Sequence, residues 1–337
     1  MPKENIVVCE VSPGERDYLK RCPFHGEMKI YDARAEQLPK DVLRGATILS
    51  PFIYSNVSAG VLKGMPKLKL IATRSTGFEH INLTECRKRH IAVANIPYYG
   101  ENTVAEHTFA LILALSRKVH QAYFRTMRGD FSFEGLQGFD LKGKTIGVVG
   151  TGHIGIHVIR IARGFAMRVL AYDINRNEFM ADTLGFKYVP LEKLLELSDI
   201  ITLHAPYNPK TRHMINKDNI NQIKRRALLI NTARGGLVDT EALAQALDKG
   251  IISGAGLDVL EGEELIKEER QILSKDFETS RLRTLIENHI LMNRENVVIT
   301  PHMAFNSREA FMRILDTTID NISAFLSGSP ANLVMTK

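Results

Sequence analysis

Residues 144–173, KTIGVVGTGHIGIHVIRIARGFAMRVLAYD, constrain the fold of this chain more than any other stretch. The apolar run 146–149 has the length and the β-branched content of a buried strand. Glycines in the spacing G-x-G-x-x-G follow it, and then come an amphipathic helical segment and a second apolar run that ends at Asp173. A strand, a glycine turn, a helix and a second strand in this order predict a parallel βαβ unit.

The three glycines and the acidic residue suit a dinucleotide. Gly150 allows a tight turn, Gly152 lets the backbone approach a pyrophosphate, and Gly155 lets the helix pack closely on the strand. The free N–H groups at the helix N-terminus face the phosphates. Asp173 lies 21 residues after Gly152 (173 − 152), where a carboxylate accepts hydrogen bonds from the adenosine ribose. We therefore predict a dinucleotide site that favours NAD over NADP, a preference that the nearby Arg176 weakens.

Length and composition describe a globular protein with room for two cores. The chain has 337 residues, of which 44% are hydrophobic and 24% are charged. The longest apolar run, 109–115, is too short to span a bilayer, and the first ten residues hold no signal-peptide core. Three cysteines, Cys9, Cys22 and Cys86, form no C-x-x-C pair and indicate free thiols in a reducing compartment. We expect a cytoplasmic protein with no membrane partner and no metal site.

The formal charge of +6 raises the question of nucleic acid. The basic residues are dispersed, however, and the densest cluster, 87–90, is short. A mildly basic surface also suits an enzyme for an anionic substrate and cofactor. We therefore expect a small-molecule enzyme that binds no nucleic acid.

Short apolar runs alternate with candidate helices along most of the chain. This alternation predicts parallel sheets with crossover connections. The first 100 residues lack the glycine pattern, so they predict a second α/β unit without a dinucleotide site. The expected strands are 6–9, 28–31, 46–49, 68–72, 91–94, 146–149, 167–172, 200–204, 227–231, 252–259 and 297–299, and the expected helices are 14–22, 58–65, 84–88, 156–165, 191–197, 217–223, 240–249 and 304–326.

Residues 102–118 differ from this pattern, because the segment VAEHTFALILALSRK is apolar on nearly all sides. Such a helix is buried on several faces. Asn102 or Thr103 can cap it, and Glu106 completes a capping box with Thr103. We expect it to bridge two domains or to form the contact of a homodimer.

Five motifs stand in order along the chain: GTGHIG at 150–155, LHAP at 203–206, INTARGGLVD at 230–239, GLDVLEGE at 256–263 and TPHMAF at 300–305. Together they resemble those of the D-isomer-specific 2-hydroxyacid dehydrogenase family, and within it the D-lactate dehydrogenases. The resemblance covers nearly the whole chain. It implies an α/β fold of two doubly wound parallel-sheet domains, with the active site in the cleft between them. A flavodoxin-like substrate domain would span 1–101 and 301–337, and a Rossmann NAD-binding domain would span 102–300.

Reduction of a 2-keto acid needs a cation for the substrate, an acid for the forming alkoxide, and a partner that keeps this acid charged. Arg234 follows the strand 227–231 at its carboxyl end, where open α/β sheets bind ligands. Its planar fork suits a carboxylate. By itself this arginine is equally consistent with a solvated surface charge, and the resemblance implies the active-site role.

The resemblance also implies the acid and its partner. His302 takes the position of the general acid in ketone reduction, which is the base in hydroxy-acid oxidation. Glu263 lies five residues after Asp258 (263 − 258), in the family pattern D-x-x-x-x-E, and a carboxylate there favours the imidazolium. Glu261 and Glu264 compete for this role, and only the spacing favours Glu263.

Further positions around the cofactor and the substrate follow from the same resemblance. Asp258 is also consistent with a cap at the strand end. A carboxylate-binding loop matches residues 74–78, where backbone N–H groups form an anion nest. Three aromatic walls, with Phe52 as a further candidate, favour a small side chain and hence pyruvate and D-lactate. The implied cofactor residues are His153 and Ile154 at the phosphates, Ala205 and Pro206 at the adenosine, and Thr232, Ala233 and Asp258 at the nicotinamide; the implied substrate residues are Ser75, Thr76 and Gly77 in the loop and Tyr54, Tyr99 and Phe305 in the walls.

The chain departs from the common family pattern after Glu263. His302 follows it by 39 positions (302 − 263), and the additional residues, 264–294, hold no Pro or Gly and predict an extra surface helix. Leu260 stands where many relatives carry an aromatic residue. The alternative substrates are glyoxylate, hydroxypyruvate or a larger branched or aromatic keto acid. A remote alternative is an NAD-sensing corepressor that uses the dehydrogenase fold for binding.

Overall fold

The structure is a computed structural model that describes residues 4–21, 26–263 and 279–334. The chain divides into two compact units, Met1–Tyr99 with Ser307–Lys337, and Gly100–Asn306. The boundaries expected from the sequence were 101/102 and 300/301. The predictions for Cys22, for Glu264 and for the first half of the additional segment lie outside the described residues.

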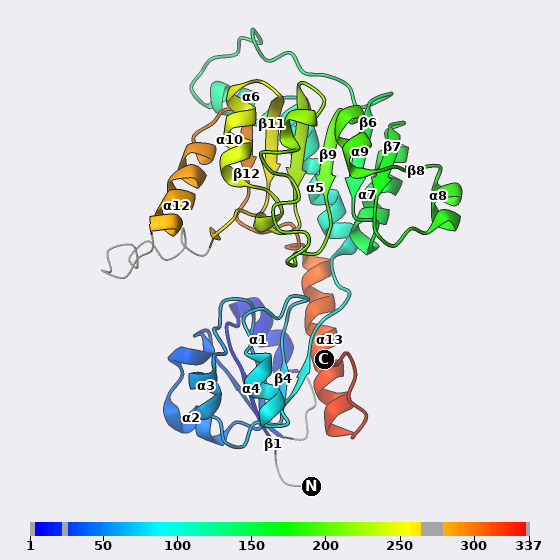
Figure 1. Cartoon of the computed structure of the whole chain (residues 1–337). Coiled ribbons are helices and arrows are strands. Elements are labelled where there is room, and N and C mark those ends of the chain that lie inside the picture. Colours follow the sequence, from blue (N-terminus) through cyan, green and yellow to red (C-terminus); the bar gives the residue numbers. More distant parts are fainter. Residues whose placement is uncertain (1–3, 22–25, 264–278, 335–337) are drawn as a thin grey trace. The chain divides into compact units, whose positions relative to one another are not determined.

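The first unit is a five-stranded parallel sheet in the order β2-β1-β3-β4-β5. Figure 1 draws this sheet in blue and cyan, with β1 and β4 labelled. This is the flavodoxin-like order, as predicted. Successive strand residues point to opposite faces, so Ile6 and Val8 join the core cluster that also contains Leu315 and Ile322, while Val7 joins the other cluster. The elements are β1 (Glu4–Val8), α1 (Pro13–Leu19), β2 (Gly26–Ile30), α2 (Lys40–Gly45), β3 (Ile48–Ser50), α3 (Ala59–Lys63), β4 (Leu70–Ala72), α4 (Leu83–Lys88), β5 (Ala92–Ala94) and the returning helix α13 (Arg308–Leu326).

The second unit is a seven-stranded parallel sheet in the order β12-β11-β10-β9-β6-β7-β8. Counted from β6, this is the Rossmann order with one more strand at the far edge. The elements are α5 (Glu101–Ser116), α6 (Val119–Met127), β6 (Thr145–Val149), α7 (His153–Gly164), β7 (Arg168–Tyr172), α8 (Glu178–Leu184), β8 (Lys187–Tyr188), α9 (Leu191–Leu197), β9 (Ile200–Leu203), β10 (Ala227–Asn231), α10 (Thr240–Asp248), β11 (Ile252–Leu257), α12 (Thr279–Met292) and β12 (Val297–Ile299).

Both faces of this sheet are buried, which explains why its strands are continuous apolar runs. Leu228 and Ile230 of β10 pack with α5 and α7, and Leu229 between them packs with α9 and α10. Helix α5 is therefore apolar on several sides because it lies inside this unit. In the described ranges, no helix has the length and apolar character needed to cross a membrane.

The predicted cap of the apolar helix is wrong. Helix α5 begins at Glu101 after Gly100, which provides no side-chain cap. Asn102 and Thr103 lie inside the first turn as a result, and the Asn102 amide donates to Glu106 Oε1 at 3.1 Å. The pair stabilises the helix as an i, i+4 contact, and the capping box does not form.

The helix expected at 217–223 is reduced to a 3₁₀ turn at Ile220–Gln222. Asparagine side chains compete with the helical backbone here. Asn219 Oδ1 accepts from the Asn216 N–H at 3.0 Å, and Asn219 Nδ2 donates to the Met214 carbonyl at 2.7 Å. These local bonds favour a turn over a regular helix.

Candidate active site

The glycine turn after β6 has the geometry that its sequence predicts. Gly150 has a φ of 96°, and a Cβ on it would lie 2.7 Å from the Ala205 nitrogen. A Cβ on Gly155 would lie 2.0 Å from the Gly150 carbonyl oxygen. Both positions therefore require glycine, because the turn and the helix approach the neighbouring backbone closely.

Gly152 differs from the other two, because a Cβ on it would meet nothing within 4 Å. It is the N-cap of α7, and a helix leaves the N–H groups of its first turn without intrahelical acceptors. The first turn of α7 contains His153 and Ile154, and the open space in front of it fits a pyrophosphate. The residues present thus suit the phosphates of a dinucleotide.

A second observation at this edge of the sheet is an unpaired ring nitrogen. His204 follows β9, next to Gly150, and its Nε2 lies 2.9 Å from Thr202 Oγ1. Its Nδ1 is buried and has no hydrogen-bond partner in the described part of the chain. Burial lowers the pKa of His204 to about 3, so the ring is neutral. A buried polar atom without a partner suits a site that a ligand completes.

Asp173 lies directly after β7 and already binds protein groups. Its Oδ2 accepts from Thr151 N at 2.7 Å and from Thr151 Oγ1 at 3.1 Å, and its Oδ1 accepts from Asn175 N at 2.8 Å. A carboxylate offers about four lone-pair sites, so capacity for a ribose hydroxyl remains on Oδ1. The Arg176 guanidinium lies 5.8 Å from the centre of the Tyr188 ring. The hydroxyl of Tyr188 lies 2.8 Å from Thr151 Oγ1, and the effect of Arg176 on the NAD preference stays a prediction.

The loop after β10 places Arg234 through a buried asparagine. Asn231 Nδ2 donates to the Arg234 carbonyl at 2.9 Å, and Asn231 Oδ1 accepts from Ala233 N at 3.0 Å. Thr232 Oγ1 lies 2.9 Å from Thr108 Oγ1 of α5. The Arg234 guanidinium is partly exposed and donates to the Ala233 carbonyl at 2.8 Å. Ala205 and Pro206 follow β9, the strand that pairs with β10.

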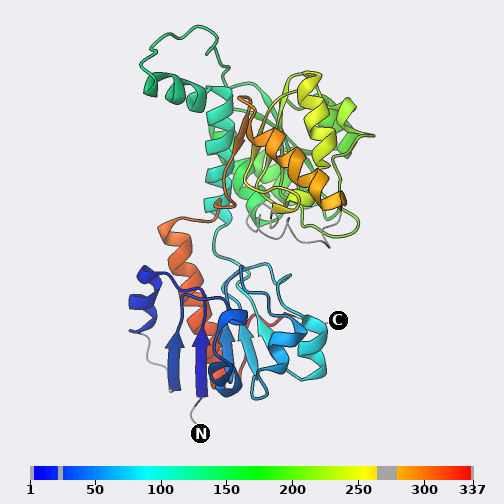
Figure 2. The same cartoon turned by 90° about the vertical axis from the view of Figure 1, so that its left-hand side faces the viewer.

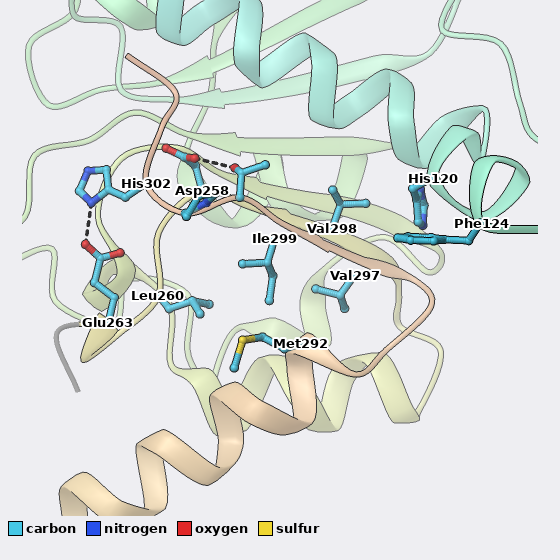
Figure 3. A pocket seen from close by; sticks show the side chains of 12 residues that line it. His120, Phe124, Asp258, Leu260, Glu263, Met292, Val297, Val298, Ile299 and His302 are labelled. Carbon is cyan, nitrogen blue, oxygen red and sulfur yellow. Dashed lines mark hydrogen bonds and ion pairs between the residues drawn. The ribbon is translucent and has the colours of Figure 1, made fainter. Parts of the chain in front are cut away.

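Figure 3 shows the His302 imidazole facing the Glu263 carboxylate, with 2.6 Å between Nδ1 and Oε1. A carboxylate only accepts, so Nδ1 carries the proton and Nε2 is the nitrogen left for chemistry. The His302 backbone is left-handed, with a φ of 54°, and its N–H donates to the Asp258 carbonyl at 2.9 Å. The structure thus brings together the histidine and the carboxylate that the sequence paired.

Asp258 is buried and holds the turn that carries His302. Its carboxylate accepts from Thr300 Oγ1 at 2.5 Å, from Met303 N at 2.9 Å and from Ala304 N at 2.8 Å. These contacts are those of the strand-end cap considered for this residue. Its place at the nicotinamide stays a prediction.

The competing Glu261 binds a different histidine. Its Oε1 lies 2.7 Å from His213 Nε2, and its carbonyl accepts from Asn288 Nδ2 of α12 at 2.9 Å. A Cβ on Gly235, next to Arg234, would lie 2.2 Å from the Leu260 carbonyl oxygen. The loop that carries Glu263 is therefore held from several sides. Sequence reasoning missed His213 and Asn288, because no local pattern reveals partners so distant along the chain.

A cavity of about 470 Å³ adjoins His302 and Glu263. Figure 3 shows the side chains of Ile299 on β12, Met292 at the end of α12 and Leu260 gathered together, with His302 and Glu263 to their left. The cavity is mainly apolar and was not foreseen from the sequence, since its walls come from three separate segments.

The first unit contains the predicted carboxylate loop, directly after β4. Ser75 Oγ donates to the Gly77 carbonyl at 2.6 Å, and Thr76 Oγ1 donates to the Ile96 carbonyl at 2.7 Å. Within the described part of the chain, the N–H groups of Thr76 and Gly77 donate to no acceptor. Two unpaired N–H groups in a loop held by its own side chains suit an anion.

The predicted aromatic walls are divided between the units. The Tyr54 side chain is 46% exposed and meets Phe52 edge to face, with 6.2 Å between ring centres. Tyr99 ends the first segment of the first unit, and its carbonyl accepts from Arg313 Nε at 2.6 Å. Phe305 belongs to the second unit, although the sequence placed it in the substrate domain.

A doubly wound domain with this glycine turn and a histidine–carboxylate pair defines a dinucleotide-dependent dehydrogenase. The NAD-binding domain of the D-isomer specific 2-hydroxyacid dehydrogenases matches residues 109–304. The chain therefore belongs to the D-isomer specific 2-hydroxyacid dehydrogenase family, and it is an NAD-dependent oxidoreductase.

Individual relatives support this assignment and differ in substrate. The D-lactate dehydrogenase of Escherichia coli is 35% identical over 330 residues, covering 96% of this chain and 97% of that protein. A glyoxylate reductase of Korarchaeum cryptofilum is 36% identical over 324 residues, covering 94% and 92%. A crystal structure of the Aquifex aeolicus D-lactate dehydrogenase complexed with NAD and lactic acid matches with a TM-score of 0.86 and 36% identity, covering 99% of this chain and 100% of that one.

Proposed function

We propose that this chain is a D-lactate dehydrogenase that reduces pyruvate with NADH. The observation that carries the proposal is the His302–Glu263 pair, in a chain similar over nearly its whole length to D-lactate dehydrogenases. The second support is the loop of Thr76 and Gly77, whose N–H groups suit a carboxylate.

In this mechanism the residues of the chain bind the substrate and move one proton. NADH, when bound, supplies the hydride to the keto carbon. Arg234 binds the substrate and polarises its carbonyl, and the N–H groups of Thr76 and Gly77 hold its carboxylate. His302 Nε2 gives its proton to the developing alkoxide, and Glu263 stabilises the imidazolium before that transfer. In the reverse direction His302 takes the hydroxyl proton as a base.

The cofactor contacts belong to the proposal as well. Gly150, Gly152 and the first turn of α7 hold the pyrophosphate, and Asp173 accepts from the adenosine ribose. The adenosine lies against Ala205 and Pro206, while Thr232, Ala233 and Asp258 lie at the nicotinamide. We also propose that Tyr54, Tyr99 and Phe305 limit the substrate side chain.

A panel of 2-keto acids tests the substrate assignment. Initial rates are measured with pyruvate, glyoxylate, hydroxypyruvate and phenylpyruvate, each with NADH and with NADPH. We expect the highest kcat/KM for pyruvate with NADH. A pyruvate value well below that of another acid would contradict the D-lactate assignment while leaving the family intact.

A second candidate is a glyoxylate reductase. The relative of that name is about as similar as the D-lactate dehydrogenases. Pyruvate and glyoxylate differ by one methyl group, which gives only about 1–3 kcal/mol of discrimination. The half-exposed Tyr54 therefore does not distinguish the two acids. The panel separates them directly. NADH binding without turnover of any acid would instead favour the corepressor alternative.

We propose a homodimer that associates through the arm, by which we mean α6 and residues 128–140. Figure 2 shows the arm projecting from the rest of its unit. Arg125 fixes the loop by donating to the carbonyls of Ser132 at 3.1 Å and Glu134 at 2.7 Å. Phe131 and Phe133 nevertheless stay 83% and 87% exposed. An ordered arm with exposed aromatic rings is typical of an association surface.

A further inference from the structure

A buried arginine is the first residue of the carboxylate loop and is not explained by the roles above. Arg74 is fully buried, and its guanidinium donates to the carbonyls of Cys9 at 2.7 Å, Glu10 at 2.9 Å and Ser50 at 3.2 Å. Its Nε lies 3.6 Å from Glu15 Oε1. Burial lowers the pKa of Arg74, and the carboxylates of Glu15 and Glu10 oppose this effect. The arginine therefore joins the ends of β1, β3 and β4.

Glu10 continues this network toward the proposed substrate pocket. Its carbonyl accepts from Arg74, and its carboxylate points to the segment after β3. Oε2 accepts from Phe52 N at 2.9 Å and also from the Ser55 hydroxyl, and Oε1 accepts from Tyr54 N at 2.8 Å. One carboxylate thus receives three donors from four consecutive residues, in charge-assisted hydrogen bonds that are stronger than neutral ones.

The backbone of Glu10 is held in an unfavourable conformation to make these contacts. Its φ is 55°, in the left-handed region that a residue with a long side chain rarely adopts. The Glu10 N–H donates to the Ala33 carbonyl at 3.1 Å, which fixes the turn. In this conformation the carbonyl and the carboxylate satisfy Arg74 and the 52–55 segment at the same time. Strain of this kind persists where the surroundings determine the geometry, often at functional sites.

We propose that Glu10 is a positioning residue that fixes Tyr54 and thereby sets the size of 2-keto acid that the enzyme accepts. The proposal rests on the proposed function, in which Tyr54 limits the substrate side chain. Arg74 couples this wall to the carboxylate loop, since its own N–H donates to the Pro51 carbonyl at 2.9 Å and Ser75 follows it directly. Loss of the Glu10 carboxylate frees the Tyr54 backbone and admits larger acids.

The test compares Glu10→Gln with Glu36→Gln. The carboxamide at position 10 keeps one acceptor oxygen and turns an NH₂ group toward N–H donors, so it cannot replace the carboxylate. Glu36 is the matched control, because its Oε2 accepts from Asn56 N at 3.1 Å, directly after the 52–55 segment, whereas Tyr54 N donates to Glu10. Glu10→Asn is the second variant should the first fail to fold, because asparagine tolerates left-handed backbone and its shorter amide does not reach the segment.

The first measurement is amide hydrogen exchange of Phe52 and Tyr54 in the free proteins. We expect exchange about tenfold or more faster in Glu10→Gln than in Glu36→Gln, the factor that a lost charge-assisted hydrogen bond allows. Equal exchange in the two variants would overturn the contact. This readout needs no turnover, so it stays decisive even where the proposed function fails.

The second measurement is the kcat/KM ratio of phenylpyruvate to pyruvate. We expect the ratio to rise in Glu10→Gln through a higher KM for pyruvate, with the KM for NADH unchanged, and to stay at the native value in Glu36→Gln. A purely structural role lowers all rates together and leaves the ratio unchanged. Faster exchange with an unchanged ratio would overturn the specificity role.

Discussion

The His302 imidazole has one nitrogen bound to Glu263, so a single nitrogen remains for the reaction. Replacement by alanine removes the acid and leaves the glycine turn intact. We expect His302→Ala to lower kcat by about 10²- to 10⁴-fold, the usual contribution of a positioned acid or base. Steady-state kinetics with NADH measures kcat, and a fluorescence titration of NADH checks that binding persists. His289→Ala, an exposed position on α12, serves as the control, and equal rates in the two variants would remove His302 from the mechanism.

His204 makes a prediction about pH. Burial lowers its pKa to about 3, whereas the unfolded chain has a histidine pKa of about 6.5. Between these two pKa values the unfolded state binds a proton that the folded state does not, so the free energy of unfolding falls as the pH decreases. Between pH 7 and pH 5 we expect a loss of about 2 kcal/mol from this residue. Urea unfolding of the native protein and of His204→Asn measures it, and identical pH slopes would contradict the assignment.

Single residues were predictable where a local spacing determines their contacts. No side chain fits at Gly150 or Gly155, because the backbone of the strand, turn and helix comes too close at both positions. That close approach is encoded within a few residues. Glu10 and His204 were not predictable, because their burial and partners depend on strands far away in sequence. Glu263 is intermediate, since the spacing preferred it to Glu261 and the structure gives the two carboxylates different histidines. The catalytic role itself stays a prediction.

Helix α12 shows why the additional segment is more than an exposed helix. Its residues Leu285 and Leu291 are buried, and the buried Asn288 holds the Glu261 carbonyl at 2.9 Å. Glu261 lies two residues before Glu263, and Gly262 between them has a φ of 67°. The helix thus fixes the loop that carries the carboxylate partner of the histidine.

Replacement of Asn288 by alanine should affect both stability and rate. Loss of a buried hydrogen bond costs about 1–3 kcal/mol of unfolding free energy. A displacement of the Glu263 carboxylate by about 1 Å lowers kcat by up to about 100-fold. Urea unfolding and kcat are measured beside Arg283→Ala, whose exposed ion pairs with Glu241 and Glu287 are screened by solvent and contribute little to stability. An unchanged kcat in a destabilised Asn288→Ala would show that α12 does not position the loop.

At the scale of elements, buried strands were predicted better than helices. The bounds 227–231 and 297–299 were predicted correctly, because each strand is mostly a continuous apolar run; β10 is buried throughout and the edge strand β12 in part. The segment 217–223 failed as a helix because Asn216 and Asn219 bind the backbone, which outweighs a short helical pattern. The strand β8 was missed, since one exposed and one partly buried residue give no hydrophobic period.

At the scale of the whole molecule, the βα alternation predicted parallel sheets, and the family resemblance implied the flavodoxin-like and Rossmann arrangements that the strand orders have. The terminal helix α13 packs on the first sheet through Leu315 and Ile322, so the first unit contains both ends of the described chain. The family resemblance predicted this discontinuity, which local periodicity cannot. The surface that α5 was expected to offer to a second copy is used within its own unit, whereas Phe131 and Phe133 of the arm are 83% and 87% exposed.

The arm gives the last prediction, which concerns the oligomeric state. A double variant, Phe131→Ser with Phe133→Ser, removes two rings that are 83% and 87% exposed and leaves the Arg125 contacts that order the loop. We expect the native protein to be a dimer and the double variant to be a folded monomer by light scattering after size exclusion, because burial of aromatic surface drives association. Phe179→Ser is the matched control, since Phe179 is 77% exposed on α8, outside the arm, and should leave the dimer intact. A native monomer, or a double variant that stays dimeric, would exclude the arm as the association surface.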